Sequence, residues 1–215
     1  MKHKGLQFIL SLLAAVSFIH TAPAAAQDTA PDVMVKKVSD KVLDIIRSEP
    51  DLKTGSIDAV VKKIEPVVLP HFDFRRMTML AVGRDWRQAS ETQRQQLQDQ
   101  FYTLLVRTYS NALRQYSNQT LTFKPLRMAK GDTTVRVQSE IRQSGSEPIQ
   151  LDYVLELQNG EWKVFDVVVA GVSLVTNYRN TFAQTVSRSG IDGLIKSLQE
   201  RNAALAQGKD PDTAQ

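Results

Sequence analysis

The sequence predicts an α+β domain in which an antiparallel sheet stands between two groups of helices. Apolar residues recur every three or four positions before residue 118 and after residue 173, which is typical of amphipathic helices. Between these limits they recur every second position, as in strands. Asn159-Gly160 separates two alternating segments and is a strong hairpin signal. We therefore expect a curved four-stranded antiparallel meander flanked by helices.

The first 26 residues have the composition of a secretory signal peptide. A basic start at Lys2-His3-Lys4 precedes an apolar stretch over residues 6–19, and Ala24-Ala25-Ala26 supplies small residues before a cleavage point. The apolar stretch is shorter than the roughly 20 residues that span a bilayer. An uncleaved anchor is therefore the less favoured alternative, and residues 1–26 are expected to direct the chain to a bacterial periplasm.

Three short helices and one long helix are predicted before the sheet. The short helices cover residues 31–48, residues 57–70 and the segment from His71 to Gly83, with breaks set by proline and glycine. The long helix begins after Ala89, because Ser90-Glu91-Thr92-Gln93 fits a capping box. A helix of about 26 residues is roughly 39 Å long, enough to cross the domain.

The four strands are predicted to begin near residues 120, 133, 149 and 161, and the first extends to Met128. In the last strand, the alternation places Asp166 on the same face as Trp162, Val164 and Val168. The run from Val167 to Val169 then breaks the alternation, so we expect this end of the strand to be buried on both faces.

Two helices close the chain, one beginning near Ser173 and one after Ser189-Gly190. Residues 207–215 are small and polar and are expected to form a disordered tail. Residues 27–206 therefore form a single domain, which is long enough to bury a sizeable core.

The composition of the exported chain excludes several classes of function. Losing Lys2 and Lys4 leaves 25 basic and 23 acidic residues, without a basic stripe for nucleic acid. The chain has no cysteine, and His71 is the one histidine outside the predicted signal peptide. The common zinc ligand sets therefore cannot form, and any Ser-His-Asp mechanism would have to use His71.

A few residues are candidates for chemistry, each with a simpler structural alternative. Asp166 and His71 could serve as acid and base, but Asp166 is more simply paired with Arg179 or with backbone N–H groups. His71, in a turn, more simply caps a helix or contacts solvent. Arg75-Arg76 could bind a phosphate, or lie on an exposed helix face. Trp86 could anchor a lipid or a partner, or pack as part of a turn.

The apolar run from Val167 to Val175 is unusually dense. Residue patterns alone favour an ordinary solid core here, although a hollow interior with the same lining would look identical in sequence.

The chain resembles the MlaC family, also called toluene-tolerance auxiliary proteins. The resemblance covers almost the whole exported chain and is specific as a set. It is carried by these segments: Gly83-Arg84-x-Trp86, Ala89-Ser90-x-x-Gln93-Arg94, Leu105-x-x-Thr108-Tyr109, Trp162-Lys163-Val164-Phe165-Asp166-Val167, Gly171-Val172-Ser173-Leu174-Val175, Tyr178-Arg179-x-x-Phe182 and Gly190-Ile191-Asp192-Gly193-Leu194.

The resemblance implies a soluble, monomeric periplasmic carrier of phospholipid that maintains the lipid asymmetry of the outer membrane. It implies a cone-like domain related to nuclear transport factor 2, with acyl chains in an apolar cavity and no metal or cofactor. The implied partners are an inner-membrane ABC transporter complex with a mammalian-cell-entry domain and an outer-membrane lipoprotein–porin complex. The implied lipid-binding residues are Phe101, Leu105, Tyr109, Tyr153, Val164, Val168, Val172, Val175 and Tyr178.

Two alternative functions stay open at this point. One is a small hydrolase or isomerase of similar shape that uses Asp166 and His71. The other is a lipoprotein chaperone, which would prefer acylated peptides to diacyl lipids. The sequence leaves open the direction of transport, the headgroup preference, the number of acyl chains and the partner-contact surfaces.

Overall fold

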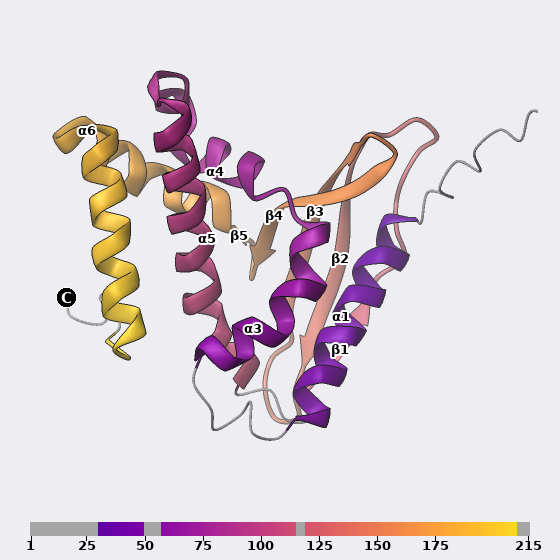
Figure 1. The fold of residues 1–215 in the computed structure, drawn as a ribbon. Helices are drawn as coiled ribbons and strands as arrows, with labels where there is room; N and C mark the ends of the chain where they lie inside the picture. The colour runs from indigo at the N-terminus through magenta and orange to yellow at the C-terminus, as the bar shows by residue number, and fades with distance from the viewer. Residues whose placement is uncertain (1–29, 50–56, 115–118, 210–215) are drawn as a thin grey trace, which may run out of the picture.

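The computed structural model describes residues 30–49, 57–114 and 119–209 (Figure 1). The predicted signal peptide and residues 210–215 of the predicted tail lie outside these ranges. Residues 207–209 form a hydrogen-bonded turn, in which the Lys209 N–H donates to the Ala204 carbonyl at 3.0 Å.

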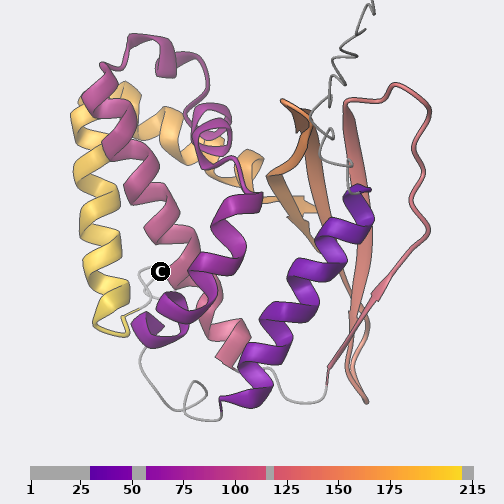
Figure 2. The same cartoon turned by 45° about the vertical axis from the view of Figure 1, so that its right-hand side comes forward.

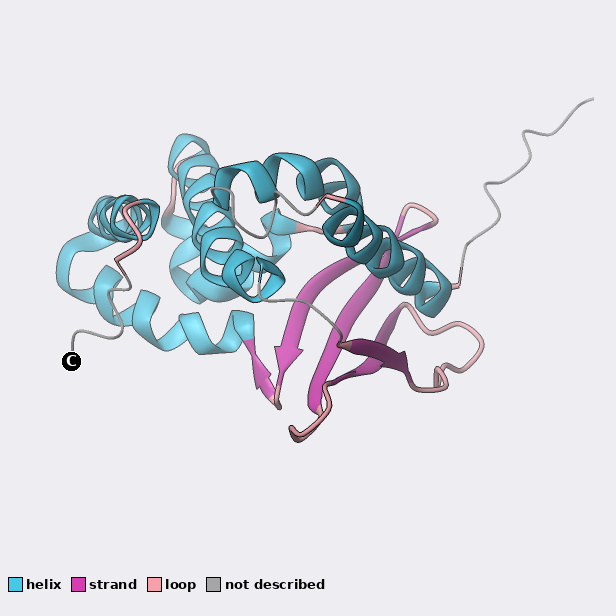
Figure 3. Cartoon of the chain, turned by 90° about the horizontal axis from the view of Figure 1, so that it is seen from below, coloured by secondary structure: helices cyan, strands magenta, loops and turns pink. Residues whose placement is uncertain are grey.

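The described residues contain seven helical elements. They are α1 (Pro31–Ser48), α3 (Ile57–Val68), the 3₁₀ turn η1 (Leu69–His71), α4 (Phe74–Val82), the 3₁₀ turn η2 (Gly83–Gln88), α5 (Glu91–Arg114) and α6 (Leu174–Ala206). Seen from below, the sheet has the helices gathered on one side of it (Figure 3). The α+β prediction is therefore confirmed.

The sheet has five antiparallel strands in sequence order, one more than predicted. They are β1 (Thr120–Phe123), β2 (Thr134–Arg142), β3 (Ile149–Gln158), β4 (Glu161–Val169) and β5 (Val172–Ser173). The fifth was missed because it is only two residues long and follows a tight turn, in which Ala170 and Gly171 have φ values of 49° and 82°. The first strand also ends at Phe123 rather than Met128.

Local signals in the sequence fix the long helix and the main hairpin. The Ser90 N–H donates to Gln93 Oε1 at 2.9 Å and the Gln93 N–H donates to Ser90 Oγ at 3.2 Å, so the predicted capping box forms. Asn159 and Gly160 both have positive φ, 51° and 82°, as the predicted two-residue hairpin turn requires.

Helix α6 bends sharply at Gly190, where φ is 69° and ψ is −174°. This is the predicted boundary between two helices. Before the bend, Tyr178 and Phe182 pack against Phe101 of α5. After the bend the chain returns along α5, where the Asn202 side-chain amide donates to the Gln100 carbonyl at 2.9 Å.

The described buried apolar side chains fall into three clusters, two of which are linked, whereas most domains of this size have one contiguous core. The helical core joins α4, η2, α5 and α6 around Phe101. The sheet core joins the first half of α1 to β2, β3 and β4 around Leu155. The α1–α3 cluster joins the second half of α1 to α3 around Ile46. Phe72 and Val167 contact both the helical core and the sheet core.

Candidate functional site

A β-bulge in β4 decides which side chains face the helices. Leu155 pairs with Val164 and Val154 pairs with Asp166, which leaves Phe165 as an extra residue. Beyond the bulge, Val167 and Val169 therefore lie on the face of Val164. The predicted face that joined Asp166 and Val168 to Val164 is wrong, because strict alternation fails at the extra residue.

The helix-facing side of the sheet carries rows of apolar residues across the strands. The cross-strand pairs align Val135, Leu155 and Val164 in one row, and Val137, Tyr153 and Val167 in the next. Two further rows follow toward the end of the sheet: Phe123, Ser139, Leu151, Val169 and Val172, and then Leu121, Ile141 and Ile149. We call the apolar residues of the last two rows the apolar floor, which leaves out the buried Ser139.

The two ends of this face differ in burial. The row of Val135, Leu155 and Val164 is fully buried in the sheet core, whereas Ile149 and Val172 at the far end are 48% and 54% exposed. A large apolar side chain that is half exposed beside others of its kind is a candidate ligand contact. The floor is therefore the part of the sheet best suited to an apolar ligand.

Helix α5 carries a second set of incompletely buried residues along one of its sides. Tyr102, Val106 and Tyr109 share one side of the helix by their spacing. Tyr109 is 36% exposed, and partial burial raises the pKa of its phenol, with a smaller contribution from neighbouring Tyr178. Tyr102 packs edge-on against Phe74.

The predicted lipid-binding residues fall into distinct groups. Four lie together in the helical core: Phe101, Leu105, Val175 and Tyr178. Val164 lies in the sheet core and Tyr153 packs against it, whereas Tyr109 and Val172 are exposed. Val168 lies on the opposite face of the sheet, beside buried Asp152. The lipid contacts of all nine stay predictions.

The floor residues Leu121, Ile141, Ile149, Leu151 and Val169 were not among the predicted contacts. Alternation within each strand identifies their side, but the strand register is needed to align them. Val169 could not be assigned to either face of the sheet without knowledge of the bulge at Phe165.

Asp166 and His71 hold separate positions. The Asp166 carboxylate accepts from Ser173 Oγ at 2.6 Å and from the Val175 N–H at 3.2 Å, at the start of α6. His71 lies near the other end of β4, where partial burial and the Lys163 ammonium lower its pKa. No described contact joins the two side chains. The simpler alternative for Asp166 therefore holds, in which its carboxylate accepts a hydrogen bond from a backbone N–H.

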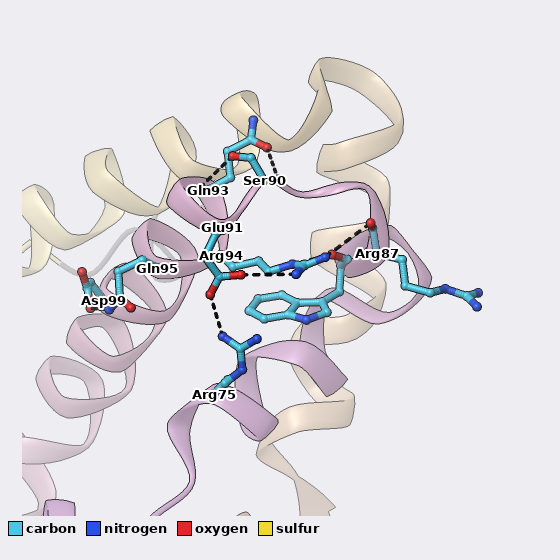
Figure 4. A network of polar contacts seen from close by, with 9 residues as sticks. Arg75, Arg87, Ser90, Glu91, Gln93, Arg94, Gln95 and Asp99 are labelled. Carbon is cyan, nitrogen blue, oxygen red and sulfur yellow. Dashed lines mark hydrogen bonds and ion pairs between the residues drawn. The ribbon is translucent and has the colours of Figure 1, made fainter.

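The arginines and the tryptophan that suggested binding are engaged within the fold. Arg75 pairs with Glu91 at 3.0 Å, and Arg76 pairs with Glu156. Trp86 is 6% exposed, and the guanidinium carbons of Arg75 and Arg94 lie 5.7 and 5.6 Å from its ring centre. Figure 4 shows Glu91 reaching both arginines beside the capping box. The packing alternative therefore holds for Trp86.

Within the described ranges, no three acidic or histidine side chains come together as a metal-binding group. The helices of these ranges are also too short or too polar to cross a bilayer.

Comparison with known proteins identifies the family. A family model described as MlaC protein matches residues 36–200. The chain belongs to the MlaC family. The intermembrane phospholipid transport system binding protein MlaC of Haemophilus influenzae is 26% identical over 196 residues, covering 90% of this chain and 91% of the relative. Toluene tolerance protein ttg2D of Pseudomonas putida is 30% identical over 208 residues, covering 94% and 91%.

A solved structure shares both the MlaC fold and much of the sequence. It is a phospholipid-binding protein from Ralstonia solanacearum, determined in complex with a phospholipid. The two structures superpose with a TM-score of 0.78 at 43% identity, over 81% of this chain and 98% of that one.

Proposed function

We propose that this protein is a periplasmic phospholipid carrier that shuttles lipid between the inner and outer membranes. The observation that carries the proposal is the likeness, at 43% identity over 98% of its length, to a protein solved with a bound phospholipid. Membership of the MlaC family, whose curated relative is named for intermembrane phospholipid transport, supports the transport role.

The physical need for a carrier follows from the acyl chains. Each methylene removed from water contributes about 0.8 kcal/mol. Two chains with about 30 methylenes would therefore cost roughly 24 kcal/mol to expose, beyond the practical ceiling of about 18–21 kcal/mol for non-covalent affinity. A protein need only match the apolar environment of the bilayer, so transfer into it can be nearly neutral and reversible.

The apolar floor and the α5 side chains Tyr102, Val106 and Tyr109 are the proposed acyl-chain contacts. Both are apolar and incompletely buried. Among the described residues, the helical core and the sheet core beside them meet through Phe72 and Val167, and this limited link suits an interior that a ligand completes. Lipid binding of this kind requires neither a nucleophile nor a metal, so we propose a binding protein rather than an enzyme. Its proposed partners are an inner-membrane ABC transporter complex and an outer-membrane lipoprotein–porin complex.

Native mass spectrometry of protein purified from the periplasm tests this function. The wild type should retain phospholipid. Val172→Glu should lose it while the protein stays folded, because a carboxylate on the floor cannot be buried against acyl chains. Val33→Glu is a matched control, since Val33 on α1 is 53% exposed and Val172 is 54% exposed. If Val172→Glu still carried a full lipid load, the floor would not be part of the lipid-binding site. If the wild type carried no lipid, the carrier function would be refuted.

The same preparation separates the alternative functions. Conversion of bound lipid to lysolipid, lost in His71→Ala, would favour the enzyme. Preference for acylated peptides over diacyl lipids would favour the lipoprotein chaperone.

A further inference from the structure

Three aromatic side chains connect the sheet to α5. The chain passes from α3 through η1 to α4 between α5 and the sheet (Figures 1 and 2). Along this passage the rings of Phe72 and Phe74 stack with their centroids 5.5 Å apart, and Phe74 meets Tyr102 of α5 edge-on at 4.9 Å. We call Phe72, Phe74 and Tyr102 the aromatic bridge.

Backbone contacts fix the sheet end of the aromatic bridge. Phe72 forms a parallel β-bridge with Val164, and the Asp73 N–H donates to the Val164 carbonyl at 2.8 Å. Phe72 therefore extends the row of Val135, Leu155 and Val164, which is buried in the sheet core. The Phe72 side chain also packs against the helical core, so the aromatic bridge lies where the two cores meet.

The aromatic bridge lies about one acyl chain away from the exposed end of the apolar floor. Along β3, Ile149 is 48% exposed, and Tyr153, four positions later, belongs to the row next to that of Phe72. At about 3.4 Å per residue these positions are roughly 14 Å apart. One leaflet supplies half of a hydrocarbon core about 30 Å thick, or roughly 15 Å. An acyl chain that enters at Ile149 and follows the strand therefore ends near the aromatic bridge.

The side chains at this inner end are accessible although they lie beside two apolar cores. All three members of the aromatic bridge are half-buried, and so is Val167 in the neighbouring row. On α5 the proposed contacts run in the same order, since Tyr102 belongs to the aromatic bridge, Val106 follows one turn later and Tyr109 is 36% exposed. Accessible apolar surface of this kind can contact the end of an acyl chain.

We propose that the aromatic bridge is the closed inner end of the acyl-chain site and selects phospholipids by the length of their acyl chains. This inference rests on the proposed carrier function and narrows its substrate class. An acyl chain that ends at the aromatic bridge keeps all its methylenes in an apolar environment, as in the bilayer. Each further methylene is excluded from the site, which lowers the affinity about fourfold relative to the bilayer.

The lipids retained by the folded protein test this selection. The protein is equilibrated with vesicles of equal parts dimyristoleoyl, dipalmitoleoyl, dioleoyl and dieicosenoyl phosphatidylglycerol, whose chains lengthen in equal steps, and native mass spectrometry gives the bound composition. The wild type should discriminate sharply against lipids beyond one chain length. Phe72→Leu removes the ring at the inner end, so this limit should move to the next longer lipid. The bound share of that lipid should rise about tenfold, because each step adds more than one methylene per chain.

Two further variants test the direction of the change. Phe74→Leu removes the central ring of the aromatic bridge and should also favour the longer lipid. Val167→Leu adds a methylene beside Phe72 and should lower the share of the longest accepted lipid about fourfold. Circular dichroism shows whether each variant is folded. Phe182→Leu is the matched control, because Phe182 is 3% exposed in the helical core and is not part of the aromatic bridge. Its bound lipids should match those of the wild type.

The outcomes separate this inference from the carrier function. If Phe72→Leu and Phe74→Leu both fold and retain the wild-type lipid composition, the aromatic bridge does not end the site. An equal shift in Phe182→Leu would assign the change to a loosened helical core and would also overturn the proposal. So would a wild type that carries the lipids in the proportions of the vesicles, although the carrier function would stand. A wild type without lipid would instead refute the carrier function itself.

Discussion

Two joints connect α5 to neighbouring helices, and they are built differently. At the Trp86 corner, Glu91 accepts from Arg75 at 3.0 Å and from Arg94 at 3.3 Å, and the arginines flank an indole that is part of the helical core. At the seam between α3 and α5, the described ion pair joins Arg107 to Asp58 at 3.8 Å, and the Asp58 side chain is 80% exposed. The described members of the α1–α3 cluster do not include α5.

The difference shows that apolar burial, rather than the number of polar contacts, decides which joint is firm. Exposed ion pairs contribute between zero and about 1 kcal/mol, whereas a buried aromatic contributes several kilocalories per mole. The corner therefore fixes α4, η2, α5 and α6 as one rigid unit. At the seam, the described residues of α3 and α5 share no cluster of buried apolar side chains, so it is the weaker joint by this criterion.

The largest expected effect comes from removing the indole at the corner. Trp86→Ala should lower the free energy of unfolding by about 3–5 kcal/mol, the usual result of truncating a buried aromatic. Urea denaturation followed by circular dichroism measures it. Arg87→Ala is the control in the same turn, since the Arg87 side chain is exposed and Arg94 contacts only its carbonyl. A loss below 1 kcal/mol in Trp86→Ala would mean that the corner is no firmer than the seam.

A smaller effect should follow from replacing the glycine at the bend of α6. Both halves of this helix contact α5, the first through Tyr178 and Phe182 and the second through Asn202. At Gly190, φ is 69° and ψ is −174°, a conformation that side chains other than glycine rarely adopt. Gly190→Ala should destabilise the fold by about 1–3 kcal/mol through backbone strain. Ser189→Ala removes an exposed hydrogen bond to the Thr185 carbonyl and should lower the free energy of unfolding by less than about 0.5 kcal/mol. Equal melting temperatures of Gly190→Ala and Ser189→Ala would show that the bend is not needed.

The firm joint could largely be predicted from the sequence. The capping box, the long helix and the break at Ser189-Gly190 are local signals, and local hydrogen bonding and glycine conformation decide them. The strand face beyond the bulge was predicted wrongly. The bulge at Phe165 moves Val168 off the helix-facing side, and nothing in the alternation up to that residue announces it.

The seam could not be predicted, for a different reason. Apolar spacing shows which side of α1, α3 and α5 is buried, but it cannot show whether the buried sides share one core. Asp58 and Arg107 are ordinary polar positions on two separate helices. Their pairing depends on how α3 crosses α5, which is a property of the tertiary structure.

The smallest expected effect concerns the polar part of the corner. Hydrogen bonding from Arg75 is the largest cause that lowers the pKa of Glu91 below its ordinary value of 4.5. A depressed folded-state pKa contributes stability above the unfolded-state value, and this stability is lost as the pH falls through the folded-state pKa. Wild-type stability should therefore fall more steeply than that of Glu91→Gln on going from pH 7 to below pH 4.

Urea unfolding midpoints at pH 7, 4 and 3 measure this difference, which should be small because Glu91 is exposed to solvent. It should shrink further in 1 M salt, where charges on the surface are screened. Glu140→Gln is the comparison on the sheet, because hydrogen bonds from Lys124 and Arg142 lower the pKa of Glu140 as well. If the pH dependence of Glu91→Gln exactly follows that of the wild type, the arginine–carboxylate contacts add nothing, and burial of Trp86 alone makes the corner firm.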